Sequence, residues 1–237
     1  MKRVLVPSFA AVLALTVGIS AQNPPANPTQ TQTPPQTQTP PAGQQQRPPQ
    51  PPLGPNQWRL DGSHSAASFS VRHMMVSTVR GQLGRITGTL EYDGKDVNSI
   101  KADVSIDVNG INTQNEGRDK HLRSPDFFDV PNHPAITFKS TRVEAAGSGK
   151  FKLIGDLTIR GTTKEVALDV EGPSPVVKSQ RGGLVTGATA TTRINRLEYG
   201  LKWNNMVEAG PVVSDEVTIT IDIEATRPAA PGTSGQL

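Results

Sequence analysis

The sequence predicts an all-β domain of antiparallel strands, folded either as a packed sandwich or as a closed barrel. In the run Val217–Glu224, apolar and polar residues alternate strictly, which is the pattern of a sheet with one buried face. The same alternation recurs in five or six other segments. Glycines 88, 155 and 187 lie inside such segments, where they permit the bends that barrel corners need. Only a barrel can enclose a ligand, so the contents of its interior decide the function.

Residues 1–56 are predicted to lie outside this domain. Residues 1–21 have the layout of a secretory signal peptide, in which Lys2 and Arg3 precede an apolar run that ends in small residues. A retained N-terminal anchor is the alternative, although the run is shorter than the roughly 20 residues of a membrane span. Residues 22–56 are almost wholly Pro, Gln, Thr, Asn and Ala, which predicts a disordered, semi-stiff linker. We therefore expect a periplasmic or secreted protein.

Residues 57–227 are long enough for one domain with a real core, and residues 228–237 are predicted to be a disordered tail. The chain has no cysteine, which excludes disulfides, thiolate metal sites and a cysteine nucleophile. Its formal charge is +3, its basic residues are scattered among acidic ones, and aromatic residues make up only 4%. Nucleic acid is therefore not expected as a partner.

Nine segments of the domain are predicted as strands. They are Trp58–Leu60, Ala67–Met74, Ile86–Tyr92, Ala102–Val108, Ile136–Phe138, Phe151–Ile159, Val166–Val170, Leu184–Ile194 and Val217–Ile223. Asp93-Gly94 predicts a tight turn, and Arg160–Thr163 predicts a hairpin. The small alternating residues of Leu184–Ile194 predict either a lightly filled wall or a strand exposed on both sides.

One region interrupts the alternation. Residues 115–122 have helical character, and Ser124-Pro125-Asp126 predicts a helix start with a capping serine and proline at the first helical position. Phe127 and Phe128 would then lie on a short helix over the domain and form a lid on the barrel mouth. The alternative is that both rings anchor this helix to the sheet edge as core residues.

Several motifs, in register across essentially the whole domain, resemble the YceI-like family. They are Asp61–Ser65, Phe69–His73, Gly117–Leu122, Asp126–Asp129, Pro134–Phe138, Gly155–Lys164, Arg196–Trp203 and Asp215–Glu224. The resemblance implies an extended, lipocalin-like antiparallel β-barrel with a short helical lid segment. It also implies export, and a lumen that binds a polyisoprenoid or a similar long apolar chain. The long linker departs from the short members of the family.

The residues themselves agree with a binding role. A barrel of about eight strands can leave its interior open for a ligand, and the mixture of large residues and glycines favours a tunnel over a packed core. We expect the tunnel to bind a polyisoprenoid or quinone-type lipid without catalysis, by burial of apolar surface at roughly 25 cal/mol per Å². The residues predicted to contact this ligand are Phe69, Val71, His73, Leu90, Ile106, Arg118, His121, Phe127, Phe128, Phe138 and Leu157.

Arg118, His121 and Arg123, beside the predicted lid, are expected to form a cationic rim that suits a diphosphate or quinone head group. The alternative is ordinary charge pairing with Asp119 and Asp126. His73 is open to two interpretations, a histidine hydrogen-bonded inside the wall or a contact of the ligand.

Two rival functions remain open. One is a metal-linked or stress-related envelope enzyme that uses His64, His73 and His121, although the sequence lacks a nucleophile-elbow motif and a histidine pair at helical spacing. The other is an interaction module with a solid barrel, whose linker recruits partners. No metal is expected, and no cofactor besides the lipid. The partners considered are a long-chain isoprenoid lipid, a membrane or cell wall near the linker, and a second copy of the domain.

Overall fold

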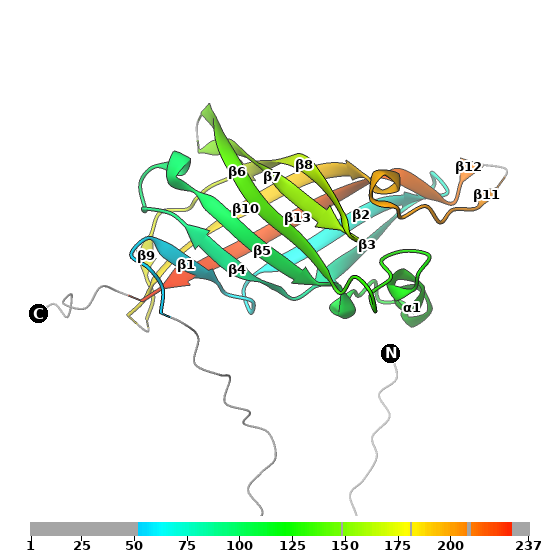
Figure 1. Ribbon diagram of the computed structural model, residues 1–237, viewed down its shortest axis with the longest axis horizontal. Coiled ribbons are helices and arrows are strands. Elements are labelled where there is room, and N and C mark those ends of the chain that lie inside the picture. The colour runs from blue at the N-terminus through cyan, green and yellow to red at the C-terminus, as the bar shows by residue number, and fades with distance from the viewer. Residues whose placement is uncertain (1–51, 148, 181, 208–209, 229–237) are drawn as a thin grey trace, which may run out of the picture. The chain divides into compact units, whose positions relative to one another are not determined.

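The computed structural model describes residues 52–147, 149–180, 182–207 and 210–228. The predicted signal peptide, residues 22–51 of the predicted linker and all but the first residue of the predicted tail lie outside these ranges. The described chain is mostly strand and forms a closed barrel (Figure 1). The all-β prediction is confirmed, and of its two alternatives the barrel is correct.

The elements follow one another along the chain with one α-helix among the described residues. The strands are β1 Gln57–Leu60, β2 Ala66–His73, β3 Ser77–Gly84, β4 Ile86–Glu91, β5 Lys101–Asp107, β6 Ala135–Gly147, β7 Lys150–Ile159, β8 Thr162–Glu171, β9 Val177–Lys178, β10 Leu184–Asn195, β11 Met206–Val207, β12 Gly210–Pro211 and β13 Val213–Arg227. The helical elements are η1 Val97–Ser99, η2 Val108–Gly110, α1 Glu116–Arg123 and η3 Arg196–Tyr199.

The barrel closes on its last strand. On one side β13 pairs with β10 along its whole length, from Leu184 opposite Arg227 to Asn195 opposite Glu216. On the other side it pairs first with β2 and then with β1. β2 and β1 pair with successive parts of β13, so together they fill the place of one strand in the wall. In the same way β3, which pairs with β2, and β4, which pairs with β1, fill the next place. With β5, β6, β7, β8, β10 and β13 they complete an eight-stranded antiparallel wall.

Strand β3 was not predicted from the sequence. Its inward register positions are Val79, Gly81 and Leu83, so the apolar alternation is broken at its centre. A side chain at Gly81 would meet the Phe69 ring at 2.7 Å. The glycine is therefore needed for close packing, and this removes the apolar residue that would have revealed the strand.

The predicted turns are found in part. Arg160 and Gly161 have φ of +48° and +73°, and they join β7 to β8 with Ile159 opposite Thr162, which confirms the hairpin. A turn also forms at Asp93, whose carboxylate accepts hydrogen bonds from the backbone N–H groups of Lys95 and Asp96, both at 2.8 Å. It is the first part of a longer connection, residues 92–100, which includes η1.

The helix start predicted at Ser124 is wrong. The side chain of Asn115 caps the first turn of α1 by accepting a hydrogen bond from the backbone N–H of Arg118 at 2.9 Å, and α1 ends at Arg123. Ser124 closes the last turn, with its N–H and hydroxyl donating to the carbonyl of His121 at 3.0 and 2.8 Å. A Ser-Pro pair suits the residues just after a helix as well as a helix start, because proline cannot continue the helix.

The barrel has two different ends. At the end we call the helix end lie α1, the β2–β3 turn and the β11–β12 hairpin (Figure 1). At the opposite end, which we call the terminal end, the described chain begins and finishes, and Arg227 donates to the carbonyl of Pro55 at 2.8 Å. Among the described residues, no helix has both the length and the apolar character needed to cross a membrane.

Candidate functional site

The lumen contains two neighbouring cavities. The inner chamber, nearer the terminal end, has a volume of about 90 Å³, and the outer chamber, nearer the helix end, has a volume of about 390 Å³. Leu83, Ile136 and Ile219 line both chambers. Twelve residue pairs join β10 to β13. At about 3.3 Å per residue and a strand tilt of about 40°, this wall is roughly 30 Å tall. The two chambers therefore lie one behind the other along the lumen and share these three side chains in their lining.

The inner chamber is almost wholly apolar. None of its lining residues is exposed on the surface. Leu90, Ile106, Phe138 and Leu157, four of the predicted ligand contacts, line it. Their role as ligand contacts stays a prediction.

Strand β10 gives this chamber its free space. Thr186, Ala188, Ala190 and Thr192 line it with small side chains, so the interpretation of this segment as a lightly filled wall is correct. Gly155 has another role than opening the tunnel. A Cβ there would lie 2.4 Å from the carbonyl oxygen of Lys139 and 2.8 Å from the Phe138 ring. The glycine thus lets the β6 backbone and the ring of Phe138 approach closely.

The outer chamber contains the other predicted contacts. Its lining includes Phe69, Val71, His73, Arg118, His121, Phe127 and Phe128. It opens to solvent at the helix end, because Arg72, Gly117 and Arg118 line it and are exposed. A molecule that entered from the helix end would meet the outer chamber before the inner one.

An aromatic cluster closes one side of the outer chamber. The His121 ring lies edge-on to Phe127 and to Trp203, with centroid distances of 5.1 and 4.9 Å, and Phe127 lies 5.3 Å from Trp203. Phe127 is buried and Phe128 is half-buried, and both follow α1 in a turn instead of lying on a helix. Phe127 belongs to the core and also lines the chamber, and its role as a lid stays a prediction. Trp203 was not predicted from the sequence.

The cationic rim is only partly paired with acids. His121 Nε2 lies 2.8 Å from Asp126 Oδ2, as the alternative of ordinary pairing expected. Arg118 instead donates from Nε to the hydroxyl of Thr113 at 2.8 Å, and from Nη2 to its carbonyl at 2.9 Å. Asp119 is buried and accepts hydrogen bonds from the backbone N–H and hydroxyl of Thr113. The Arg118 guanidinium thus lies at the mouth next to neutral oxygens.

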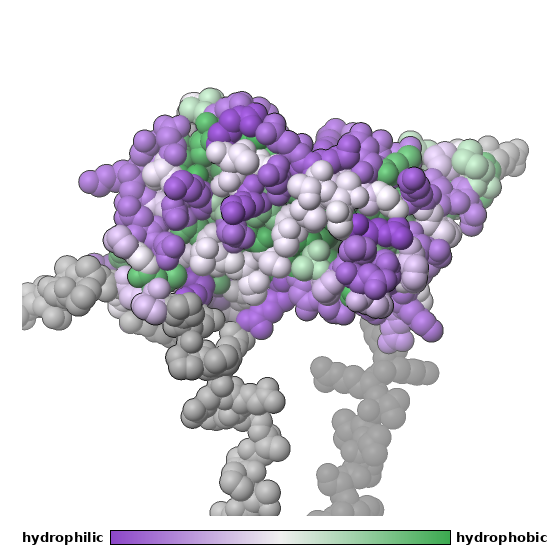
Figure 2. Space-filling model, in the orientation of Figure 1, coloured by the Kyte–Doolittle hydropathy of each residue, from purple (hydrophilic) through white to green (hydrophobic). Residues whose placement is uncertain are grey.

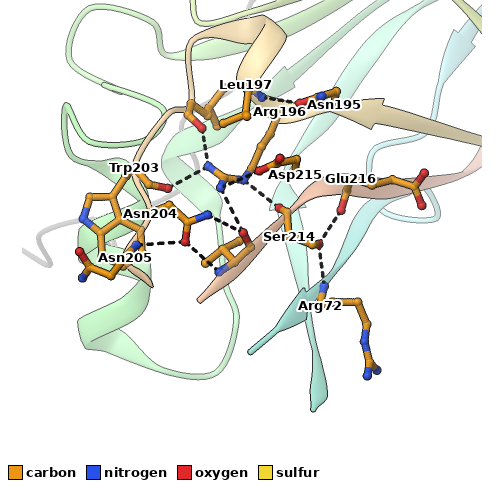
Figure 3. A network of polar contacts seen from close by, with 12 residues as sticks. Arg72, Asn195, Arg196, Leu197, Trp203, Asn204, Asn205, Ser214, Asp215 and Glu216 are labelled. Carbon is orange, nitrogen blue, oxygen red and sulfur yellow. Dashed lines mark hydrogen bonds and ion pairs between the residues drawn. The ribbon is translucent and has the colours of Figure 1, made fainter. Parts of the chain in front are cut away.

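Arg196 is a buried charge in the wall of the outer chamber (Figure 3). Arg196 is 3% exposed, and its guanidinium donates to four carbonyl groups, those of Leu201, Trp203, Val213 and Ser214, at 2.5 to 3.2 Å. Burial lowers the pKa of Arg196, and Asp215, 3.5 Å away, opposes that shift. Its contacts hold the chain after η3 against the start of β13, which fixes one side of the chamber.

The predicted histidines do not form one cluster. His73 and His121 line the outer chamber, whereas His64 lines neither chamber and is exposed. His64 Nδ1 lies 3.1 Å from Asp61 and 3.5 Å from Glu224, and these three side chains offer potential metal-ligating atoms within 4.8 Å of one another. Hydrogen bonds from Ser63 and His64 lower the pKa of Asp61 to about 2. The enzyme interpretation required His64, His73 and His121 together and gains no support from this arrangement.

Comparisons with known proteins agree with the fold and with the motifs of this domain. A family model described as YceI-like domain matches residues 58–225. The UPF0312 protein SA2479 of Staphylococcus aureus (strain N315) is 39% identical over 154 residues, which cover 65% of this chain and 87% of that protein.

Two solved structures show the same architecture. A YCEI protein of Campylobacter jejuni has 28% identity and a TM-score of 0.58, covering 67% of this chain and 90% of its own. A polyisoprenoid binding domain from Saccharophagus degradans, implicated in plant cell wall breakdown, has 17% identity and a TM-score of 0.53, covering 72% of this chain and 98% of its own. At that identity the second likeness is one of fold.

Proposed function

The chain belongs to the YceI-like domain family, and from this membership and its lumen we propose that it binds a long apolar lipid inside the barrel. The observation that supports this most is the pair of chambers along a wall roughly 30 Å tall, with an almost wholly apolar lining. Such a shape suits an extended chain of the polyisoprenoid or prenylquinone type better than a compact metabolite. The Saccharophagus degradans neighbour described as a polyisoprenoid binding domain has the same fold.

The distribution of polar groups gives the ligand a direction. The inner chamber is lined by apolar side chains and by the small residues of β10. Burial of a hydrocarbon tail there would contribute roughly 25 cal/mol of binding free energy per Å² of apolar surface. The charged side chains Arg72 and Arg118 lie at the opening of the outer chamber. We propose that the tail occupies the inner chamber and that a polar end group lies near the helix end.

The proposed role is sequestration or carriage, without catalysis. Binding alone accounts for the arrangement, since His73 and His121 face the chamber from different elements and His64 lies outside it. We also propose that the protein acts in the periplasm or outside the cell. The signal-peptide pattern of residues 1–21 supports export.

Native mass spectrometry of the full chain tests the proposal, with the protein purified from a host whose cell envelope supplies such lipids. We expect a bound species with the mass of a polyprenyl or prenylquinone lipid at close to one molecule per chain, identified after organic extraction. A mass equal to that of the protein alone, unchanged after incubation with such lipids, would contradict the proposal. It would favour a solid barrel or a polar ligand.

A further inference from the structure

Exposed apolar side chains gather at the helix end of the barrel. The exposed large apolar residues of the described chain are Met75, Val76, Val177, Met206 and Val207. All except Val177 lie on the β2–β3 turn or on β11, and we call these four residues the apolar tips. Their two segments are linked through Val212, whose carbonyl accepts a hydrogen bond from the Met74 N–H at 2.9 Å. Apolar colour is visible over the β11–β12 hairpin in Figure 2.

The two methionines of the β2–β3 turn have a strained backbone conformation. Met74 and Met75 have φ of +51° and +58°, in the left-handed region where Gly, Asn or Asp is usual and a bulky side chain is an outlier. Such strain is retained mainly where it has a function. A turn that needed only to connect two strands would be more stable with Asn or Gly, so the two methionines indicate a role for the side chains themselves.

The apolar tips are continuous with the mouth of the outer chamber. Arg72 and His73 end β2, just before the β2–β3 turn, and Val212 and Val213 follow the β11–β12 hairpin. All four residues line that chamber. Arg72 donates to the carbonyl of Met75 at 2.6 Å and to the hydroxyl of Thr78 at 3.0 Å. Like Arg118, it has no carboxylate partner among the described residues. The mouth therefore has an apolar edge with two guanidinium groups beside it, which complements the acyl chains and phosphates of a phospholipid surface.

We propose that the apolar tips insert into the boundary between head groups and acyl chains of a phospholipid bilayer, with Arg72 and Arg118 contacting lipid phosphates. This placement rests on the proposed function and specifies how the lipid is exchanged. The mouth of the outer chamber faces the bilayer, and the ligand passes between membrane and lumen without crossing water. The described chain begins and finishes at the terminal end, so both flanking segments join the barrel away from this surface.

Flotation of the full chain with vesicles tests the surface directly. The vesicles are made of phosphatidylcholine alone or of phosphatidylcholine mixed with phosphatidylglycerol. We expect the wild-type chain to float with both, and more with the anionic mixture. The variant Met75→Asn with Met206→Ser should lower the bound fraction at least about fivefold. Arg72→Gln should remove only the gain from phosphatidylglycerol.

Two controls separate docking from folding. Val177→Ser removes an apolar side chain of the same 55% exposure as Met75, but at the terminal end, and should leave flotation unchanged. Met75→Asn alone should keep or raise the melting temperature, because Asn tolerates the left-handed conformation of this position. A stable variant that no longer floats assigns the loss to the surface.

Several results would overturn the docking proposal. A wild-type chain that floats with neither vesicle would do so, as would equal losses for Val177→Ser and the Met75→Asn, Met206→Ser pair. A dimer in analytical ultracentrifugation that Met75→Asn dissociates would make the apolar tips a contact between copies. Native mass spectrometry of the same samples distinguishes the two proposals. Bound lipid without flotation refutes docking alone, whereas a persistently empty lumen refutes the lipid function.

Discussion

The imidazole of His121 and the indole of Trp203 meet edge to face, with ring centroids 4.9 Å apart. This contact joins α1 to the chain after η3, and both residues line the outer chamber. Phe127 adds a third ring to the same cluster. The chamber is thus closed on this side by packed rings, which can separate without breaking a strand pairing.

We predict that Trp203→Ala speeds the release of bound lipid about tenfold, because loss of the indole removes ring contacts that hold the chamber closed. Transfer of a fluorescent prenyl lipid from the protein to vesicles measures this rate. Lys202→Ala, a change at the adjacent exposed position, is the control and should have little effect. An unchanged release rate together with a loss of stability of about 3 kcal/mol would make Trp203 a core residue only.

Replacement of Arg196 should be costly to the fold. Arg196→Met leaves four carbonyl groups without their shared donor, so we expect the free energy of unfolding to fall by about 3 kcal/mol or more. Asp215→Asn should lower the free energy of unfolding by less than about 1 kcal/mol. The Asp215 side chain is 51% exposed, and its carboxylate comes no nearer to the guanidinium than 3.5 Å. Urea denaturation of both variants measures the difference. Equal losses would mean that the ion pair, not the carbonyl contacts, provides the stability.

The inner chamber should be blocked by a larger side chain on β10. Ala190 lines this chamber opposite Ile221 of β13, so Ala190→Trp would occupy the space of the lipid tail. We expect bound lipid to be lost in native mass spectra, at a stability cost of about 1–3 kcal/mol from overpacking. Arg193→Trp places the same ring at an outer position of the same strand, where the present side chain is 70% exposed. A folded Ala190→Trp variant with full occupancy would place the ligand elsewhere.

The Asp61 carboxylate should make stability depend on acid pH. Its folded pKa of about 2 lies below its ordinary value of 3.8, so the unfolded chain takes up the proton first as pH falls. The stabilisation is complete above about pH 4 and is lost as pH falls toward 2. Asp61→Asn should lower the urea midpoint at neutral pH and should approach the wild-type value near pH 2. A constant difference between the two proteins over that range would show that Asp61 does not cause the dependence.

Much of the wall could be predicted because its residues alternate with a period of two. The run that became β13 has Val217, Ile219 and Ile221 facing the lumen. The same parity correctly assigned Phe69 and Val71 of β2 to one face. Every residue predicted as a ligand contact lines one of the two chambers, although contact with a ligand itself stays a prediction.

The helix end could not be predicted in the same way, because its contacts join residues far apart in the chain or depend on irregular backbone. Nothing near Arg196 in the sequence indicates that the carbonyl groups of residues 201–214 would surround its guanidinium. Trp203 lies in a connection without periodicity, and its presence in the Arg196–Trp203 motif was the only signal. The Ser124-Pro125 pair is compatible with either end of a helix, so its local chemistry could not decide between them.

Among the strands of the described chain, the one that completes the barrel is also the last to be synthesised. Until β13 is present, β10 lacks its full-length neighbour, and β1 and β2 lack the strand that joins them to the other side of the wall. Ala66 must meet Asp222, which lies more than 150 positions later. Such distant pairings slow folding, because a long loop must close before its contacts stabilise it. A nascent chain therefore cannot close its barrel until β13 has left the ribosome, however early the other strands have formed.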